Sequence, residues 1–229
     1  MLTLGIDTAG AGAIVSLDDG SALTTMEATI RPQGEALSDT VGRALMERGA
    51  KFSDLSALAV SLGPGSFTGL RIGLAYAKGV CVARSVPLLG LTRFEETVSV
   101  YGAGFDALVA TVSHRQVYLW VRDSLALPSA GSAHAGGRVS VADSAGTMDR
   151  IATLPSSSRI GRISAFGITP PDYSNSAVNI AELALSSESL LRSARGRSLS
   201  FSPNILESIE PFYAQPSTAE ILHARRMGA

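Results

Sequence analysis

Residues 57–84 of this chain read ALAVSLGPGSFTGLRIGLAYAKGVCVAR. The stretch begins as a short apolar run, which is typical of a buried strand, and Gly63-Pro64-Gly65 then interrupts the run. Residues 66–84 contain no proline and suit a long helix with Ser66 or Thr68 as its N-cap. A strand, a glycine-rich turn and a helix in this order point backbone N–H groups and a positive helix end at an anion. The stretch therefore favours an α/β fold with an anion site at the turn.

The predicted helix carries two faces of small residues. They are Gly69, Gly73 and Ala77 on one face, and Ala75, Gly79 and Ala83 on the other. A glycine inside a helix costs roughly 0.5–1 kcal/mol relative to alanine, so its repeated use indicates close packing. We expect the second face to rest on the sheet and the first to receive a partner subunit. The alternative is that both faces are covered within one chain.

Composition restricts the function. The chain has 229 residues, 45% of them apolar and 17% charged, and its formal net charge is −1. This describes a globular protein and argues against one that holds nucleic acid by itself. The single cysteine, Cys81, lies in an apolar helical run, so we expect a buried structural thiol. No basic segment precedes Asp7, and no apolar helix is long enough to cross a bilayer, so a cytoplasmic protein without a membrane segment is expected.

The order of predicted elements gives the fold class. In the first half, strands are expected at 2–6, 13–17, 21–29, 57–62 and 87–91, and helices at 35–46, 66–84 and 93–100, the last capped by Thr92. Three antiparallel strands followed by alternating helices and strands are typical of a ribonuclease H-like half. In the second half, strands are expected at 107–112, 116–122, 138–141 and 159–163, a loop at 128–137, and helices at 177–192 and 218–226.

The first predicted strand ends in Asp7, which is followed by a turn rich in glycine and alanine. A carboxylate in this position handles phosphate or metal in phosphotransfer folds, but an aspartate here can equally bond its own backbone. The residues expected at a nucleotide site are Asp7, Thr8, Gly63, Gly65 and Ser66. The three histidines lack the spacing of a zinc pair, and neither a G-x-S-x-G elbow nor a complete phosphate-binding P-loop motif occurs.

Three short motifs together resemble the TsaB (YeaZ) family of the glycoprotease (peptidase M22) superfamily. They are Gly63–Gly73, Gly5–Ala9 and Glu210–Tyr213. The resemblance implies an α/β, actin-like (sugar-kinase and ribonuclease H-like) fold of two βββαβα-type lobes. It places the lobes at residues 1–103 and 104–212, with a helix at about 213–229 packing back on the first lobe. The second lobe departs from the family pattern at 113–118, at 161–163 and at Gln215.

The same resemblance implies a non-catalytic scaffold or activator that pairs with a TsaD-type subunit for threonylcarbamoyl transfer to a tRNA adenosine. TsaD-type proteins carry two metal-binding histidines spaced H-x-x-x-H, and these positions align by hand with Arg93 and Thr97. Arginine has no lone pair to donate and threonine is a poor neutral ligand, so we expect neither metal nor catalytic residues. ATP and magnesium are expected only at the level of the complex.

The expected partners are the TsaD-type subunit, a TsaE-type ATPase, a second copy when the chain is alone, and tRNA only through the complex. The residues expected at the partner interface are Leu37, Val41, Gly69, Arg71, Ile72, Gly73 and Tyr76. Arg71 fits a contact with phosphate, with a partner carboxylate or with a surface neighbour, and its position does not decide among them. Two other functions stay open: a stand-alone small-metabolite kinase or ATPase that uses Asp7 and the Gly63–Gly65 turn, and a homodimeric structural protein.

Overall fold

Two mixed β-sheets form the framework of the chain. The computed structural model describes residues 1–28, 33–102, 104–113, 116–123, 132–134, 137–142, 144–164, 180–185, 187–195, 197 and 199–213. The first sheet, in the order β3-β2-β1-β4-β5, consists of β1 (Leu2–Asp7), β2 (Ala13–Asp18), β3 (Leu23–Ala28), β4 (Leu55–Gly63) and β5 (Leu88–Thr92). The second, in the order β11-β10-β6-β7-β9-β8, consists of β6 (Ala107–Ser113), β7 (Gln116–Arg122), β8 (Ser132–His134), β9 (Gly137–Ala142), β10 (Ile160–Ser164) and β11 (Ile180–Ala184).

The two sheets repeat one topology. In the first, β1, β2 and β3 pair antiparallel, and β4 and β5 continue the sheet in parallel on the other side of β1. In the second, β6, β7 and β9 correspond to β1, β2 and β3, while β10 and β11 pair in parallel beyond β6. The extra strand β8 pairs with β9 at the edge. The predicted α/β, actin-like fold of two ribonuclease H-like lobes is confirmed.

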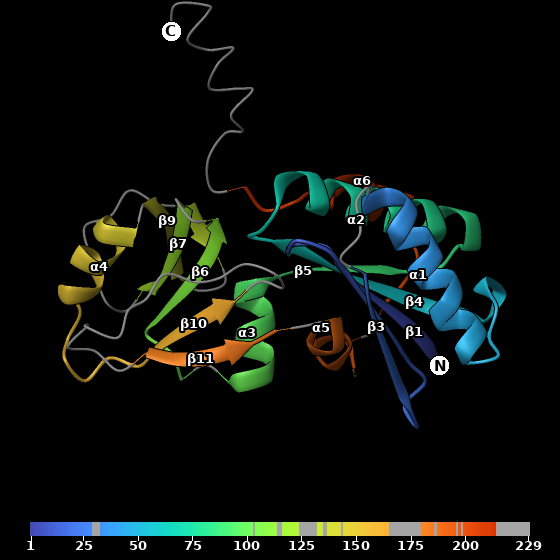
Figure 1. The fold of residues 1–229 in the computed structure, drawn as a ribbon, viewed down its shortest axis with the longest axis horizontal. Coiled ribbons are helices and arrows are strands. Elements are labelled where there is room, and N and C mark those ends of the chain that lie inside the picture. The colour runs from blue at the N-terminus through green and yellow to red at the C-terminus, as the bar shows by residue number, and fades with distance from the viewer. Residues whose placement is uncertain are drawn as a thin grey trace, which may run out of the picture.

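Helices cover both faces of the first sheet (Figure 1). They are α1 (Gln33–Glu47), α2 (Phe67–Arg84), α3 (Arg93–Tyr101), α4 (Ser144–Ala152), α5 (Ser187–Ala194) and α6 (Pro203–Ser208), with a short 3-10 helix at Phe52–Asp54. Helices α1 and α2 cover one face, α5 covers the other, and α3 lies between the two sheets. Helix α5 packs so closely on β1 that a Cβ at Gly5 would lie 2.8 Å from the Ser187 carbonyl oxygen. The end of the chain therefore completes the core of its beginning.

The helix caps follow the sequence signals. The Ser66 hydroxyl oxygen accepts a hydrogen bond from the Gly69 amide at 3.2 Å and caps α2, which confirms one of the two predicted N-caps. Thr92 begins α3 in a capping box with Glu95, since each side chain accepts a hydrogen bond from the backbone amide of the other residue. Ser66 follows the end of β4 after Pro64 and Gly65, and Thr92 is the last residue of β5. They therefore fix the starts of α2 and α3 at the same edge of the sheet.

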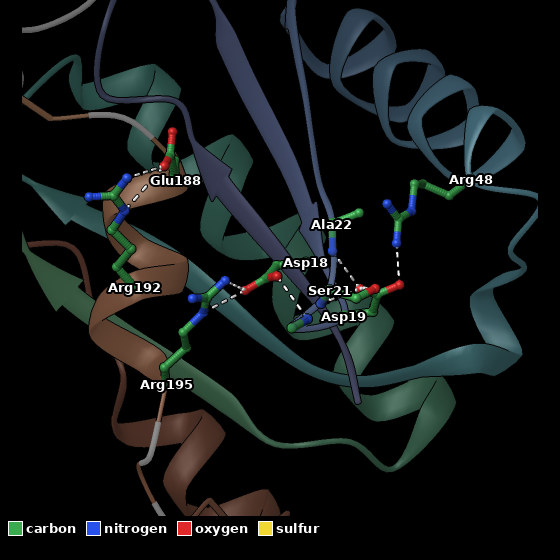
Figure 2. Close-up of polar contacts among 9 residues, drawn as sticks. Asp18, Asp19, Ser21, Ala22, Arg48, Glu188, Arg192 and Arg195 are labelled. Carbon is green, nitrogen blue, oxygen red and sulfur yellow. Dashed lines mark hydrogen bonds and ion pairs between the residues drawn. The ribbon is translucent and has the colours of Figure 1, made fainter.

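The β2–β3 turn is held between α1 and the end of α5 (Figure 2). Asp18 pairs with Arg195 at 2.7 Å, and Asp19 pairs with Arg48 at the end of α1. The Asp18 side chain is buried, whereas that of Arg195 is 58% exposed. This pair connects positions 177 residues apart. Because α5 lies on the first sheet, contacts cross the expected division at residue 103, and the domain limits stay a prediction.

Several sequence predictions for the second half are wrong. Residues 180–184 form strand β11, which pairs with β10, so the helix expected at 177–192 is confined to α5. A segment as short as Ile180–Ala184 fits a helix or a strand equally well. Part of the loop expected at 128–137 forms β8, and α4 and α6 were not predicted. The helices expected at 213–229 and 218–226 lie outside the described residues, apart from Tyr213.

Candidate functional site

The end of β1 and the glycine turn after β4 are hydrogen-bonded to each other. The Asp7 Oδ1 atom accepts a hydrogen bond from the Ala9 amide at 2.9 Å, and the Ser66 amide donates to the Ala9 carbonyl at 2.7 Å. A Cβ at Gly65 would overlap Ala9, and Gly63 has a positive φ of 92°. Only glycine allows both this approach and this backbone angle. The Gly-Pro-Gly turn is thus shaped by the strand end that it covers.

Arg93 closes the same place from the other side. Its Nη2 atom lies 2.7 Å from Oδ2 of Asp7, and the two side chains are 1% and 2% exposed. Asp7 therefore both bonds its own backbone, as one sequence interpretation held, and pairs with a residue 86 positions away. Within a fully buried pair of this kind, each charge offsets part of the desolvation cost of the other.

Helix α3 turns a polar face to the interior beside this pair. Arg93, Glu96 and Thr97 lie at helical spacing and are all buried, and the Thr97 hydroxyl donates to the Arg93 carbonyl at 2.7 Å. Neither carboxyl oxygen of Glu96 has a hydrogen-bond partner among the described residues. Burial raises the pKa of Glu96 well above its usual value, with the nearby Asp7 charge acting in the same direction and Arg93 opposing it. Burial therefore favours the protonated form of Glu96, while Arg93 forms its ion pair with Asp7.

The two small-residue faces of α2 are exchanged relative to the prediction: the face expected to receive a partner is the buried one. Gly69 and Gly73 are buried, and a Cβ at either would overlap the Thr8 carbonyl or hydroxyl oxygen. Gly79 is exposed, and a Cβ there would meet nothing within 4 Å. The assignment of Gly69, Gly73 and Ala77 to a partner is therefore wrong, because the end of β1 lies against that face. The outward face carries Ala75, Gly79 and Ala83 instead.

The motif near the end of the chain lies against the end of β4, the start of α2 and helix α3. The Phe212 amide donates to the Leu62 carbonyl at the end of β4 at 2.7 Å, and the Phe212 ring meets Phe94 edge-on at 6.2 Å between centroids. The next ring, of Tyr213, stacks on Phe67 with centroids 4.8 Å apart. Three segments far apart in sequence thus meet at one strand edge.

The five residues expected at a nucleotide site lie at one place, where Ala9 contacts both the end of β1 and the glycine turn. Asp7 and Thr8 are buried, Gly63 is buried, and Gly65 and Ser66 are partly exposed. Because the Asp7 carboxylate is already neutralised by Arg93, these residues do not fit a divalent cation at Asp7. Within the described residues, no group of three or more His, Cys, Asp and Glu side chains is placed to hold a metal. Nucleotide binding stays a prediction.

The residues expected at the partner interface divide into two groups. Leu37 and Val41 are fully buried in the core beneath α1, as Gly69 and Gly73 are beneath α2, so these four do not reach a partner surface. Arg71 is exposed, and Ile72 and Tyr76 are partly exposed. Burial raises the pKa of Tyr76, which shares a hydrogen bond with Ser38 of α1. The interface prediction now depends on the outward residues alone.

Sequence reasoning missed the two contacts that define the site. Arg93 was singled out for its failure to bind metal, and its role as the counter-ion of Asp7 was not foreseen. The stacking of Tyr213 on Phe67 was also missed, although both residues belong to motifs that were recognised. Cys81 is buried as expected, and burial raises the pKa of its thiol to about 12.

Two hollows lie away from the motif cluster. One, of about 340 Å³, lies beside the Asp18–Arg195 pair and is lined in part by Thr3, Ala57 and Leu191. The other, of about 310 Å³, follows strand β5 and is lined in part by Leu88 and Ile209. Neither includes a residue that the sequence assigned to a site.

Comparison with known proteins agrees with this geometry. The family model described as "TsaD: tRNA N6-adenosine threonylcarbamoyltransferase" matches residues 27–123. The Escherichia coli (strain K12) tRNA threonylcarbamoyladenosine biosynthesis protein TsaB is 36% identical over 93 residues, which cover 40% of each chain. The structure of YeaZ from Pseudomonas aeruginosa superposes with a TM-score of 0.60 at 20% identity, over 93% of this chain and 99% of that one. The chain is thus similar to TsaB and to the threonylcarbamoyltransferase family over part of its sequence, and it shares the fold of YeaZ.

The likeness in sequence covers only part of the chain. A tRNA N6-adenosine threonylcarbamoyltransferase of Clostridium perfringens (strain SM101 / Type A) is 38% identical over 73 residues, which cover 32% of this chain and 22% of that protein. The chain thus matches less than half the length of these curated relatives, whereas the YeaZ fold extends over almost all of it. Among the helices of the described residues, none is long and apolar enough to span a bilayer.

Proposed function

We propose that the chain is a non-catalytic subunit that pairs with a TsaD-type protein and supports transfer of a threonylcarbamoyl group to an adenosine of tRNA. One observation carries the proposal: the guanidinium of Arg93, a residue within the region that matches the threonylcarbamoyltransferase family model, lies against the Asp7 carboxylate at the end of β1. A guanidinium cannot ligate a metal, and here it already supplies the positive charge that a bound cation would bring to Asp7. The chain then keeps the fold of the catalytic relatives without their metal chemistry.

The proposed assembly uses the outward side of α2. This side presents the small residues Ala75, Gly79 and Ala83 to solvent, with Arg71 and Tyr76 beside them. A helix without bulky side chains lets a partner helix approach closely. The same surface serves a TsaD-type subunit in the complex and a second copy when the chain is alone. A TsaE-type ATPase, ATP and tRNA act at the level of the complex, in the cytoplasm.

Co-purification with the TsaD-type protein of the same cell tests the proposal. We expect a stoichiometric complex, and we expect threonylcarbamoyl transfer by that complex to stop when this chain is omitted. Elemental analysis of the isolated chain should find no stoichiometric iron or zinc. Failure to form the complex, or transfer that proceeds at full rate without this chain, contradicts the proposal.

A second measurement separates the proposal from a stand-alone kinase or ATPase. ATP turnover is measured separately for the isolated wild-type chain and for its Asp7→Asn variant. We expect no turnover above background in either protein. The reason is that the Asp7 carboxylate, which lies beside the glycine turn, is already paired with Arg93. Turnover at an enzyme-like rate that Asp7→Asn abolishes supports the kinase instead.

A further inference from the structure

We propose that Arg71 is a preorganised anchor for a carboxylate of the partner protein, an inference that rests on the function proposed above. Arg71 lies on the exposed side of α2, one turn from its start. Its guanidinium carbon lies 4.0 Å from the centroid of the Phe67 ring and 5.9 Å from that of the Tyr213 ring. Its Nε atom donates a hydrogen bond of 3.3 Å to the Tyr213 hydroxyl. Two rings and one hydrogen bond thus hold an exposed guanidinium in place.

This guanidinium differs from other exposed arginines of the chain. Arg192 pairs with Glu188, and Arg195 pairs with Asp18 (Figure 2). Among the described residues, no carboxylate lies within salt-bridge distance of Arg71. Its Nη1 and Nη2 groups therefore keep the two parallel donors that match a carboxylate.

The ring contacts lower the entropic cost of binding a carboxylate through Arg71. Ordering a free arginine side chain on binding costs rotamer entropy. Phe67 and Tyr213 have already ordered Arg71 in the unbound chain, so a partner carboxylate gains both hydrogen bonds at a smaller entropic cost. Arginine and tyrosine in such clusters are the residue types that most often dominate the affinity of protein interfaces.

The surroundings favour a protein over a nucleic acid. The formal net charge of the chain is −1, so the wider surface offers little attraction to RNA phosphates. One and two turns further along the same side of α2 lie Ala75 and Gly79, both exposed, which leave room for a partner helix. The occupant is therefore a protein helix or loop that carries an Asp or Glu opposite Arg71.

The test measures binding of the full-length chain to the TsaD-type subunit. Wild type is compared with Arg71→Ala, Arg71→Lys, Arg71→Glu and Tyr213→Phe, and Arg138→Ala, which removes an exposed arginine of the second sheet, is the matched control. A hot-spot arginine predicts about a 10- to 100-fold weaker complex for Arg71→Ala and a greater loss for Arg71→Glu. Arg71→Lys should lie between these and wild type, Tyr213→Phe should weaken binding less, and Arg138→Ala should bind as wild type.

Zero-length carbodiimide cross-linking of the Arg71→Lys complex identifies the carboxylate. An amide bond should form, with loss of water, between the lysine at position 71 and one Asp or Glu of the partner. This cross-link should be missing in wild type, whose only lysines are Lys51 and Lys78. Arg71→Ala and Arg71→Glu complexes as tight as wild type overturn the inference, as does a cross-link from position 71 to this same chain. Weaker tRNA binding with unchanged subunit binding overturns it in favour of RNA. If wild type does not bind the subunit at all, the proposed function fails and this inference fails with it.

Discussion

Arg93 and Asp7 form a buried ion pair with 2.7 Å between Nη2 and Oδ2. The pair joins the start of α3 to the end of β1, and Glu96, one turn along α3, lies near enough for both charges to act on its pKa. Two carboxyl groups and one guanidinium therefore share an interior space. Because burial and the Asp7 charge both favour the protonated form of Glu96, the space is close to electrically balanced by the Asp7–Arg93 pair.

This balance predicts unequal effects of removing either partner. Arg93→Met leaves the Asp7 carboxylate buried without a counter-ion and should lower the free energy of unfolding by about 3–5 kcal/mol. Asp7→Asn should lower it less, because Glu96 can lose its proton and pair with Arg93 in place of Asp7. Urea denaturation of both variants measures the difference.

The control for this comparison is Arg192→Met, which breaks the exposed pair with Glu188 on α5. An i,i+4 pair on a helix surface contributes only about 0.3–0.5 kcal/mol. Equal losses for Asp7→Asn and Arg93→Met would show that Glu96 does not take over.

Glu96 should give the chain a characteristic dependence of stability on pH. Its pKa is raised in the folded state, so the folded chain binds the proton more tightly than the unfolded chain does. Its contribution is therefore fully favourable below the ordinary pKa of a glutamate and decreases as pH rises toward the folded pKa. Glu96→Gln keeps the shape of the neutral acid, so above that ordinary pKa it should be at least as stable as wild type, with a margin that grows with pH. Unfolding experiments from about pH 4 to pH 8, a range that includes carboxyl titration, test this. A margin that shrinks as pH rises contradicts it.

The glycines of α2 should respond in opposite ways. Gly73→Ala places a methyl group against the Thr8 hydroxyl and should destabilise the chain. Gly79→Ala meets open space and should stabilise the isolated chain by up to about 1 kcal/mol through helix propensity. Thermal melts distinguish the two variants. For the same reason, Gly79→Leu should block pairing while the monomer stays folded. Gly73→Leu should instead disrupt the monomer itself.

Isolated chain should bind tRNA weakly or not at all at physiological salt. Its net charge is −1, and nucleic-acid affinity comes largely from clustered Lys and Arg that release counterions. Filter binding or fluorescence anisotropy with the unmodified tRNA measures this. Adding the TsaD-type subunit should produce binding, and tight binding without that subunit contradicts the prediction.

The sequence predicted the first sheet well because its signals are local. The buried run of β4, the Gly63–Gly65 break and the Ser66 cap lie next to one another, and each acts on its immediate neighbours. Which face of α2 is buried could not be predicted in the same way. Both faces are made of small residues, so the hydrophobic pattern hardly distinguishes them, and the position of Thr8 decides between them.

Long-range contacts account for most of what the sequence left unpredicted in the site. The Asp7–Arg93 pair and the Arg71–Tyr213 hydrogen bond join residues 86 and 142 positions apart, respectively. A single sequence contains no local signal for such pairings. The error at β11 has a different cause, because Ile180–Ala184 is too short for a helical and an extended pattern to be told apart without its partner strand β10.

The position of α5 on the first sheet also affects how the chain folds during its synthesis on the ribosome. During synthesis, β1 to β5 emerge early, but the surface at Gly5 and Ser16 is covered only when Ser187 and Leu191 have been made. Until then, one side of an apolar sheet stays exposed, and such surfaces are prone to aggregation. A nascent chain that stops before α5 should therefore be sensitive to protease and depend on chaperones, although every strand of the first sheet is already present.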